Sequence, residues 1–198
     1  MSRPRIKKSE ITPDTNQRMV LALSGSLRAA SLNTAMLSMA INCAPPGLTV
    51  QLYLGLGELP AFNPDLKFQD FPAVVRLHHL IGAADALLIA SPEYAHGVSG
   101  VMKNALDWIV ASDVMVHKPV ALWNAAPRAS HAIAALRETL TVMSAHLVDT
   151  AHLNLLIRAA APGQPVTNPD PAAIRRALVS LQKELQRPSH DQRRAGHF

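Results

Sequence analysis

Short apolar runs alternate with amphipathic segments along most of the chain. The short runs are bounded by turn residues and are typical of buried strands. The segments between them carry apolar residues three and four positions apart, as a helix with one buried face requires. The predicted strands are 19–24, 48–54, 85–90, 120–125 and, with a weaker pattern, 146–155. The predicted helices are 31–44, 71–84, 99–112, 130–145 and about 171–186.

This alternation predicts an α/β fold. Five strands separated by helices indicate a parallel sheet covered on both faces, and right-handed crossovers make a doubly wound sheet the most economical arrangement. The chain has 198 residues, which is the size of one domain. We assign residues 19–186 to this domain, and we interpret residues 1–18 as a disordered basic N-terminal extension and residues 187–198 as a disordered C-terminal tail.

The formal charge of +5 lies in the two predicted tails. Residues 1–18 carry five basic and two acidic side chains, and residues 187–198 carry three basic and one acidic side chain. Residues 19–186 carry eleven of each sign. Because the predicted domain is neutral, the charge indicates no basic face, and we do not expect nucleic acid as a partner.

Cysteine usage and hydropathy indicate the compartment. Cys43 is the single cysteine, which excludes an internal disulfide and fits a reducing compartment, and we interpret it as a small buried helix residue. No apolar run reaches the roughly 18 residues of a membrane span, and residues 1–18 lack the apolar centre of a signal peptide. We therefore expect a cytoplasmic protein that binds no membrane. The nine histidines form no metal-ligand pattern such as HExxH, so we expect no bound metal.

The first predicted strand runs into a loop that suits a phosphate monoester. Gly25 allows a sharp turn, Ser26 and Ser31 offer hydroxyls, and Arg28 offers a fixed positive fork. A helix begins near Leu32, so its unpaired N–H groups and positive dipole end face the same loop. The loop matches neither the GxxxxGK[ST] motif nor the GxGxxG motif. The alternative is that Ser31 only caps the helix and Arg28 is only solvated.

A second specialised loop follows the third predicted strand. It reads "SPEYAHGVSGVMKNALDWI" at 91–109, where Pro92 fixes the chain, Gly97 allows close backbone approach and a helix begins near Ser99. The first and third strands of a doubly wound sheet are neighbours at the point where the strand order reverses. One loop can therefore hold a phosphate while the other lines a flat ring.

Two motifs carry a resemblance to a known family. "SGSLRAASLN" at 24–33 and "PEYAHGVSGVMKNALDW" at 92–108 resemble the NADPH-dependent FMN reductases, flavodoxin-like enzymes that include quinone, azo-dye and chromate reductases. The resemblance covers nearly all of residues 19–186 and implies a flavodoxin-like, doubly wound, five-stranded parallel sheet. The residues that match the family's phosphate and ribityl loop are Ser24, Ser26, Arg28, Ser31 and Asn33. Those that match its loop against the isoalloxazine ring are Pro92, Glu93, Tyr94 and Gly97.

The sequence departs from the family pattern in two places. Many members have asparagine after the Pro-Glu-Tyr triplet, where this chain has Ala95 followed by His96. The loop after the fourth strand is often rich in glycine in the family, whereas 123–132 here contains none. We assign Asn124 of this loop to the edge of the flavin, and Arg128 either meets the phosphate of NADPH or is an exposed helix-start residue.

The resemblance implies an enzyme that passes hydride from NADPH, or NADH, to bound FMN. The electrons then go to a quinone, an azo compound, a flavin or a metal oxyanion. No acid or base side chain is required, so no catalytic residue is assigned, and Tyr94 is the residue expected to shape the stacking site. The alternatives are a flavodoxin-like electron carrier and a non-catalytic flavin-binding module.

The third predicted helix also bears on assembly. We interpret its Trp108 as a core or subunit contact and expect Lys103 and Asp107 to pair on the surface. Members of the family usually pair, so we expect a homodimer or homotetramer, with the apolar helices at 99–112 and 129–145 able to supply an interface.

Overall fold

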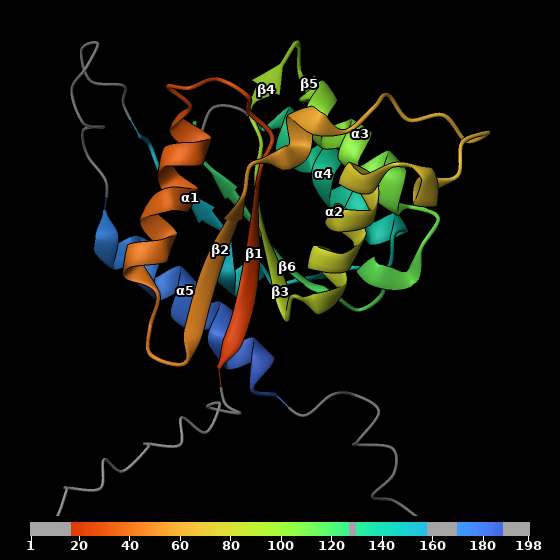
Figure 1. Ribbon diagram of the computed structural model, residues 1–198. Helices are drawn as coiled ribbons and strands as arrows, with labels where there is room; N and C mark the ends of the chain where they lie inside the picture. Colours follow the sequence, from red (N-terminus) through yellow and green to blue (C-terminus); the bar gives the residue numbers. More distant parts are fainter. Residues whose placement is uncertain (1–16, 127–129, 158–169, 188–198) are drawn as a thin grey trace, which may run out of the picture.

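Parallel strand pairing builds the centre of the molecule, and helices cover both faces of the sheet (Figure 1). The computed structural model describes residues 17–126, 130–157 and 170–187. The strands run in the order β2-β1-β3-β6-β7, and β8 also pairs with β6. Their bounds are β1 (Arg18–Ser24), β2 (Leu48–Tyr53), β3 (Ala86–Ala90), β6 (Pro119–Asn124), β7 (His146–Leu147) and β8 (Leu153–Asn154). Strand order reverses between β1 and β3, as a doubly wound sheet requires.

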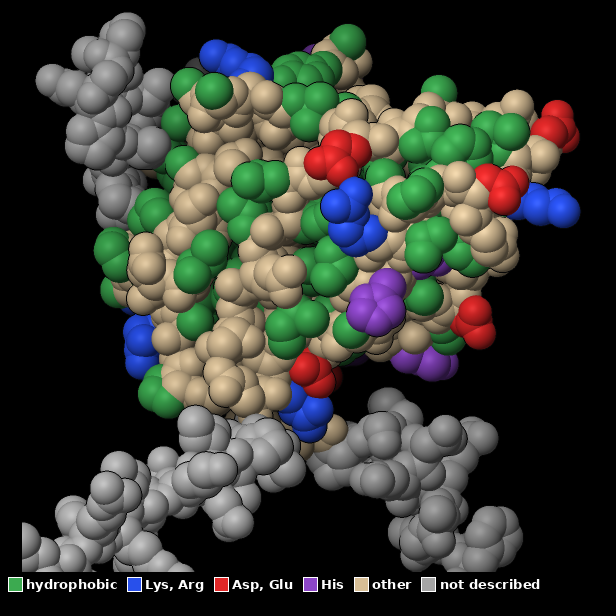
Figure 2. Space-filling view, viewed as in Figure 1, with side chains coloured by type: hydrophobic (Ala, Val, Ile, Leu, Met, Phe, Trp, Pro, Cys, Tyr) green, Lys and Arg blue, Asp and Glu red, His purple; other side chains and the backbone are tan. Residues whose placement is uncertain are grey.

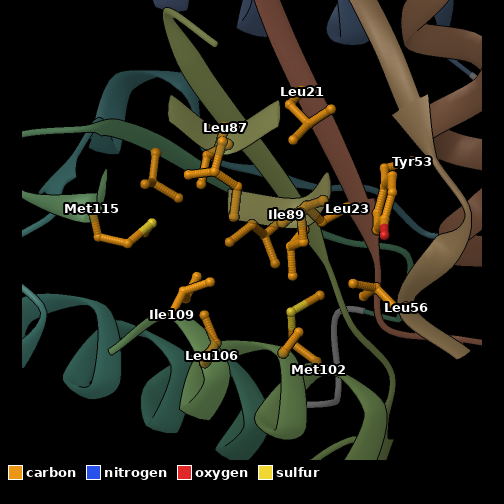
Figure 3. Packing of buried hydrophobic residues seen from close by; sticks show 14 of the residues in the cluster. Leu21, Leu23, Tyr53, Leu56, Leu87, Ile89, Met102, Leu106, Ile109 and Met115 are labelled. Carbon is orange, nitrogen blue, oxygen red and sulfur yellow. The ribbon is translucent and has the colours of Figure 1, made fainter. Parts of the chain in front are cut away.

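The helices divide into two layers because side chains alternate along each strand. Their bounds are α1 (Leu32–Cys43), α2 (Pro72–Ala83), α3 (Gly100–Ile109), α4 (His131–Val142) and α5 (Pro171–Leu185). Leu21 and Leu23 of β1 face the cluster formed with α2, α3 and α4, whereas Val20 and Ala22 face the cluster formed with α1 and α5. Figure 3 shows the first cluster, with Leu87 and Ile89 of β3 opposite the buried side chains of α3.

The sequence pattern placed four strands and five helices correctly, and each of their ends agrees with the structure to within three residues. The predicted fifth strand at 146–155 lies beside β6 but is not continuous, because the 3-10 turn η4 (Asp149–Ala151) divides it into β7 and β8. The described sheet therefore has six strands rather than the predicted five. At this break the Nδ1 atom of His152 accepts the N–H of Leu122 at 2.8 Å, so an imidazole takes the place of a strand carbonyl. The weaker apolar pattern of 146–155 reflects this interruption.

The predicted tails lie almost wholly outside the described residues. The described domain begins one residue earlier than predicted, since Arg18 opens β1 and pairs with Asp85 at 2.8 Å. On the face shown in Figure 2, Lys and Arg side chains are scattered among Asp and Glu rather than gathered in one patch. Within the described ranges, no helix has the length and apolar character needed to cross a bilayer.

The structure places the apolar side chains of one face of α3 in the subunit's own core. Trp108 is buried and its Nε1–H donates to the carbonyl of Pro60 at 2.8 Å, which confirms the core interpretation. The expected surface pair is also present, with Lys103 Nζ 2.6 Å from Asp107 Oδ1. Because the apolar side chains of α3 already pack inside the domain, they add little to the predicted subunit interface.

The imidazole at the strand break makes stability depend on pH. Burial lowers the pKa of His152, the charge of Arg137 lowers it further, and Asp149 acts in the opposite direction. A histidine in the unfolded chain has a pKa of about 6.5, so below that pH the unfolded state binds a proton that the folded state excludes. The free energy of unfolding should therefore fall on acidification, by up to about 1.4 kcal/mol per pH unit.

Urea unfolding between pH 7.5 and 5.5 measures this effect. We expect the His152→Asn variant, whose amide oxygen can still accept the Leu122 N–H, to lose most of the pH dependence. The control is His79→Gln on the exposed side of α2, which should keep the wild-type dependence. A wild-type protein that is equally stable across this range would contradict the assignment.

Candidate functional site

A pocket lies at the carboxyl ends of β1, β3 and β6, where the strand order reverses. Ligands of open α/β sheets bind at this place. Its walls come from the loops that follow these three strands. Eight of the ten predicted cofactor residues line it: Ser26, Arg28, Ser31, Asn33, Pro92, Glu93, Tyr94 and Asn124. The prediction that two loops far apart in sequence meet at one site is therefore confirmed.

Gly25 allows the first two loops to approach each other. Its N–H donates to the carbonyl of Ala90 at 2.8 Å and continues the pairing of β1 with β3. A Cβ atom at Gly25 would lie 2.5 Å from Ser91 Oγ and 2.8 Å from Ser99 Oγ, closer than side-chain atoms can pack. Its backbone is not left-handed, so the need for glycine is one of space rather than of the predicted sharp turn.

The start of α1 combines a satisfied cap with open donors. Ser31 Oγ accepts the N–H of Thr34 at 3.2 Å, so Ser31 does cap the helix. The N–H groups of Leu32 and Asn33 have no acceptor in the described part of the chain. Open N–H groups at the positive end of a helix bind anions. The cap and a phosphate site are therefore compatible interpretations of this loop.

Asn33 and Arg28 carry further unused hydrogen-bonding capacity. Asn33 is buried, lines the pocket, and its Oδ1 atom has no hydrogen-bond partner among the described residues. A buried polar atom without a partner is unfavourable, so it calls for a donor from a ligand. Arg28 is exposed at the pocket and forms no ion pair within the described ranges. This set of groups fits an anion attached to hydroxyl groups.

Two predicted residues do not line the pocket. Ser24 is buried, and its Oγ lies 2.7 Å from Thr34 Oγ1, so it joins the end of β1 to α1. Gly97 belongs to a short strand, and a Cβ atom there would come no closer than 3.5 Å to the carbonyl oxygen of Tyr94. Within the described chain, a side chain at Gly97 would therefore meet no protein atom closer than ordinary van der Waals contact.

The loop after β3 contains a hairpin that the sequence pattern did not indicate. β4 (Glu93–Tyr94) and β5 (Gly97–Val98) pair antiparallel across a two-residue turn. Both turn residues are left-handed, with φ of 48° at Ala95 and 62° at His96. Asn-Gly is the sequence that favours such a turn. Figure 1 shows the hairpin at the same end of the sheet as the loop between β1 and α1.

The third wall of the pocket is the end of β6. Asn124 is buried there, and its Oδ1 accepts the N–H of Ala126 at 2.9 Å. Ala125 and Ala126 line the pocket beside it. Arg128, which we considered for the phosphate of NADPH, lies outside the described residues. Within the described ranges, no group of three or more His, Cys, Asp or Glu side chains could hold a metal ion.

Comparison with models of protein families identifies the family to which this chain belongs. Residues 19–158 match the family model described as NADPH-dependent FMN reductase. The chain belongs to this family. The resemblance in the two loop motifs is thus confirmed, and the expected FMN, NADPH and oxidoreductase class hold at the level of the family.

Individual relatives agree with this assignment. The chain is 48% identical over 90 residues to an NAD(P)H-dependent FMN reductase of Pseudomonas aeruginosa, a match that covers 45% of this chain and 48% of the relative. It is 42% identical over 109 residues to an NADPH:quinone oxidoreductase of Arabidopsis thaliana, which covers 52% and 55% of the two chains. The chain thus spans about half the length of these curated relatives.

Solved structures confirm the flavodoxin-like fold. The flavoenzyme NAD(P)H:(acceptor) oxidoreductase FerB of Paracoccus denitrificans superposes with a TM-score of 0.64 and 28% identity, over 85% of this chain and 93% of that chain. A flavodoxin from an archaeon superposes with a TM-score of 0.58 and 16% identity, over 85% and 99%. The second likeness concerns the fold alone.

The tight packing around Gly25 predicts that adding one methyl group at this position lowers the stability of the protein. Gly25→Ala should lower the free energy of unfolding by about 1–3 kcal/mol, because the new Cβ must displace the backbone or Ser91. The matched control is Gly100→Ala, since a Cβ at Gly100 in the first turn of α3 meets no atom within 4 Å. That variant should be as stable as wild type or up to about 1 kcal/mol more stable. Urea unfolding of the FMN-free proteins measures both, and equal stability of the Gly25→Ala variant would refute the packing argument.

Proposed function

We propose that this protein binds FMN in the pocket and catalyses the reduction of a small acceptor by NADPH or NADH. The acceptor classes are quinones, azo compounds, flavins and metal oxyanions. The observation that carries the proposal is the set of unused polar groups at the start of α1, in a chain that belongs to the NADPH-dependent FMN reductases. Because the chain spans about half of its curated relatives, their activities support the proposal without deciding it.

The groups in the pocket fit the two polar parts of FMN. The open N–H groups of Leu32 and Asn33, together with the Arg28 guanidinium, suit a dianionic phosphate. The unpartnered Oδ1 of Asn33 needs a donor, which the hydroxyl groups of a ribityl chain supply. One ligand that carries both a phosphate and hydroxyl groups therefore satisfies the donors and the acceptor together.

The described residues anchor and cover the ligand rather than exchange protons with it. Bound FMN supplies the redox chemistry, accepting hydride from a reduced nicotinamide and returning electrons to an acceptor. Tyr94 is 53% exposed beside the pocket, so its ring is free to pack against a flat molecule there. Asn124, Ala125 and Ala126 line the pocket from the end of β6.

Assembly and location are also proposals. We infer a homodimer or homotetramer in the cytoplasm, in keeping with the expectation from the family. The exposed Val110 and Val142 follow or end α3 and α4 and are available for a subunit contact. Since the rest of the apolar surface of α3 is buried inside the subunit, this interface would depend on few side chains.

The absorption spectrum of the purified protein with added FMN tests the function. We expect a bound flavin whose visible band bleaches within seconds when NADPH is added without oxygen, and recovers when a benzoquinone follows. A flavin that binds but stays oxidised with both NADPH and NADH would favour the non-catalytic module. A flavin that NADPH and NADH leave oxidised but dithionite reduces would equally fit the electron carrier, which needs no nicotinamide site. A protein that binds no FMN would defeat all three hypotheses.

A further inference from the structure

Two contacts join the β4–β5 hairpin to the start of α4. The Glu93 carboxylate accepts the N–H of Ala132, with 2.9 Å between Oε2 and N. The imidazole rings of His96 and His131 stack with centroids 4.2 Å apart and planes 11° apart. Since Ser130 makes no side-chain capping bond in the described structure, Glu93 acts as the cap of α4 from a different part of the chain.

The turn of the hairpin needs such support. Ala95 and His96 both adopt the left-handed conformation, which costs energy for residues other than glycine. Alanine has no polar side chain that could compensate by a local hydrogen bond. A strained turn persists only where its surroundings hold it. Here two contacts with α4 hold the turn: one comes from Glu93, which precedes the turn, and the other from His96, which is part of it.

The docked hairpin is also one wall of the pocket. Glu93 and Tyr94 line it from β4, and Asn124 to Ala126 line it from the end of β6. α4 follows this second wall in the chain, so the bond from Glu93 to Ala132 joins the hairpin to the helix that comes after that wall. A hairpin that left α4 would carry Tyr94 with it and widen the space between the walls.

We propose that Glu93 and His131 are positioning residues for the acceptor site. They hold the hairpin against α4 so that Tyr94 keeps its place at the edge of the pocket. This assignment gives the Glu93 carboxylate a mechanical role through Ala132, in addition to its place in the loop that the family pattern sets against the flavin. It rests on the proposed function, because the consequence for an acceptor requires turnover.

Hydrogen exchange of the FMN-free protein tests the docking itself. We expect Glu93→Ala to speed exchange of the amides in residues 93–98 by about tenfold, the effect of losing one hydrogen bond to a charged group. Glu93→Gln keeps an oxygen that can accept the Ala132 N–H, so its exchange should stay closer to wild type. The control Glu138→Ala removes an exposed carboxylate from α4, and it should leave the exchange rates of residues 93–98 unchanged. Unchanged exchange in Glu93→Ala, or equal acceleration in Glu93→Gln, overturns the proposal.

Steady-state kinetics of the FMN-loaded protein test the consequence for the acceptor. His131→Ala removes the stack and should raise the KM for a benzoquinone severalfold with a smaller change in kcat, while His131→Phe preserves a flat ring and should restore most of the loss. Equal KM values in wild type and His131→Ala, with thermal stability confirming both are folded, overturn the positioning role. A wild-type protein that does not bind FMN refutes the proposed function, and the exchange experiment still decides whether the hairpin is docked.

Discussion

The close contact of Gly25 with Ser91 and Ser99 is the constraint on which the site depends. It lets the ends of β1 and β3 lie side by side at the reversal of strand order. The phosphate-type loop and the hairpin loop grow from these two ends, so any side chain at Gly25 would push them apart. The pocket is therefore a consequence of backbone packing in the sheet. Its polar groups determine which ligand it can bind, but they do not create it.

Asn33 Oδ1 is one of two buried side-chain atoms without a partner in the described chain, and the one that lies at the pocket; the other is the hydroxyl of Tyr53. The caps of α1, α3 and α5 use Ser31, Ser99 and Asp170. In contrast, Asn33 Oδ1 is buried beside the pocket without a partner in the described chain. A domain that tolerates such a group is less stable than it could be, and a ligand that supplies the missing partner recovers this energy.

Local signals predicted most of the fold and the loop between β1 and α1 that lines the pocket. The turn residues and the spacing around 24–33 lie within one strand-loop-helix unit, so their geometry follows from neighbouring residues. The prediction of a continuous fifth strand missed the break at His152, where the imidazole replaces a backbone carbonyl as the acceptor for the N–H of Leu122. A hydrophobic pattern carries no signal for such a replacement. The sequence did not predict the hairpin because Ala95 and His96 lack the Asn-Gly signature. Contacts with Ala132 and His131 of α4, which lie 39 and 35 residues further along the chain than Glu93 and His96, hold the turn instead.

Comparing the binding of FMN and riboflavin, which differ only in the phosphate, tests the anchoring of the ligand most directly. In wild type we expect FMN to bind far more tightly than riboflavin by calorimetry. Arg28→Ala should weaken FMN binding by about 1.5–3 kcal/mol, as expected for a hydrogen bond to a charged group, and should leave riboflavin binding unchanged. The control is Arg187→Ala, which removes a guanidinium paired with Glu184 just after the end of α5. Equal affinities of wild type for the two flavins would contradict the account, as would an Arg28→Ala variant that loses both alike.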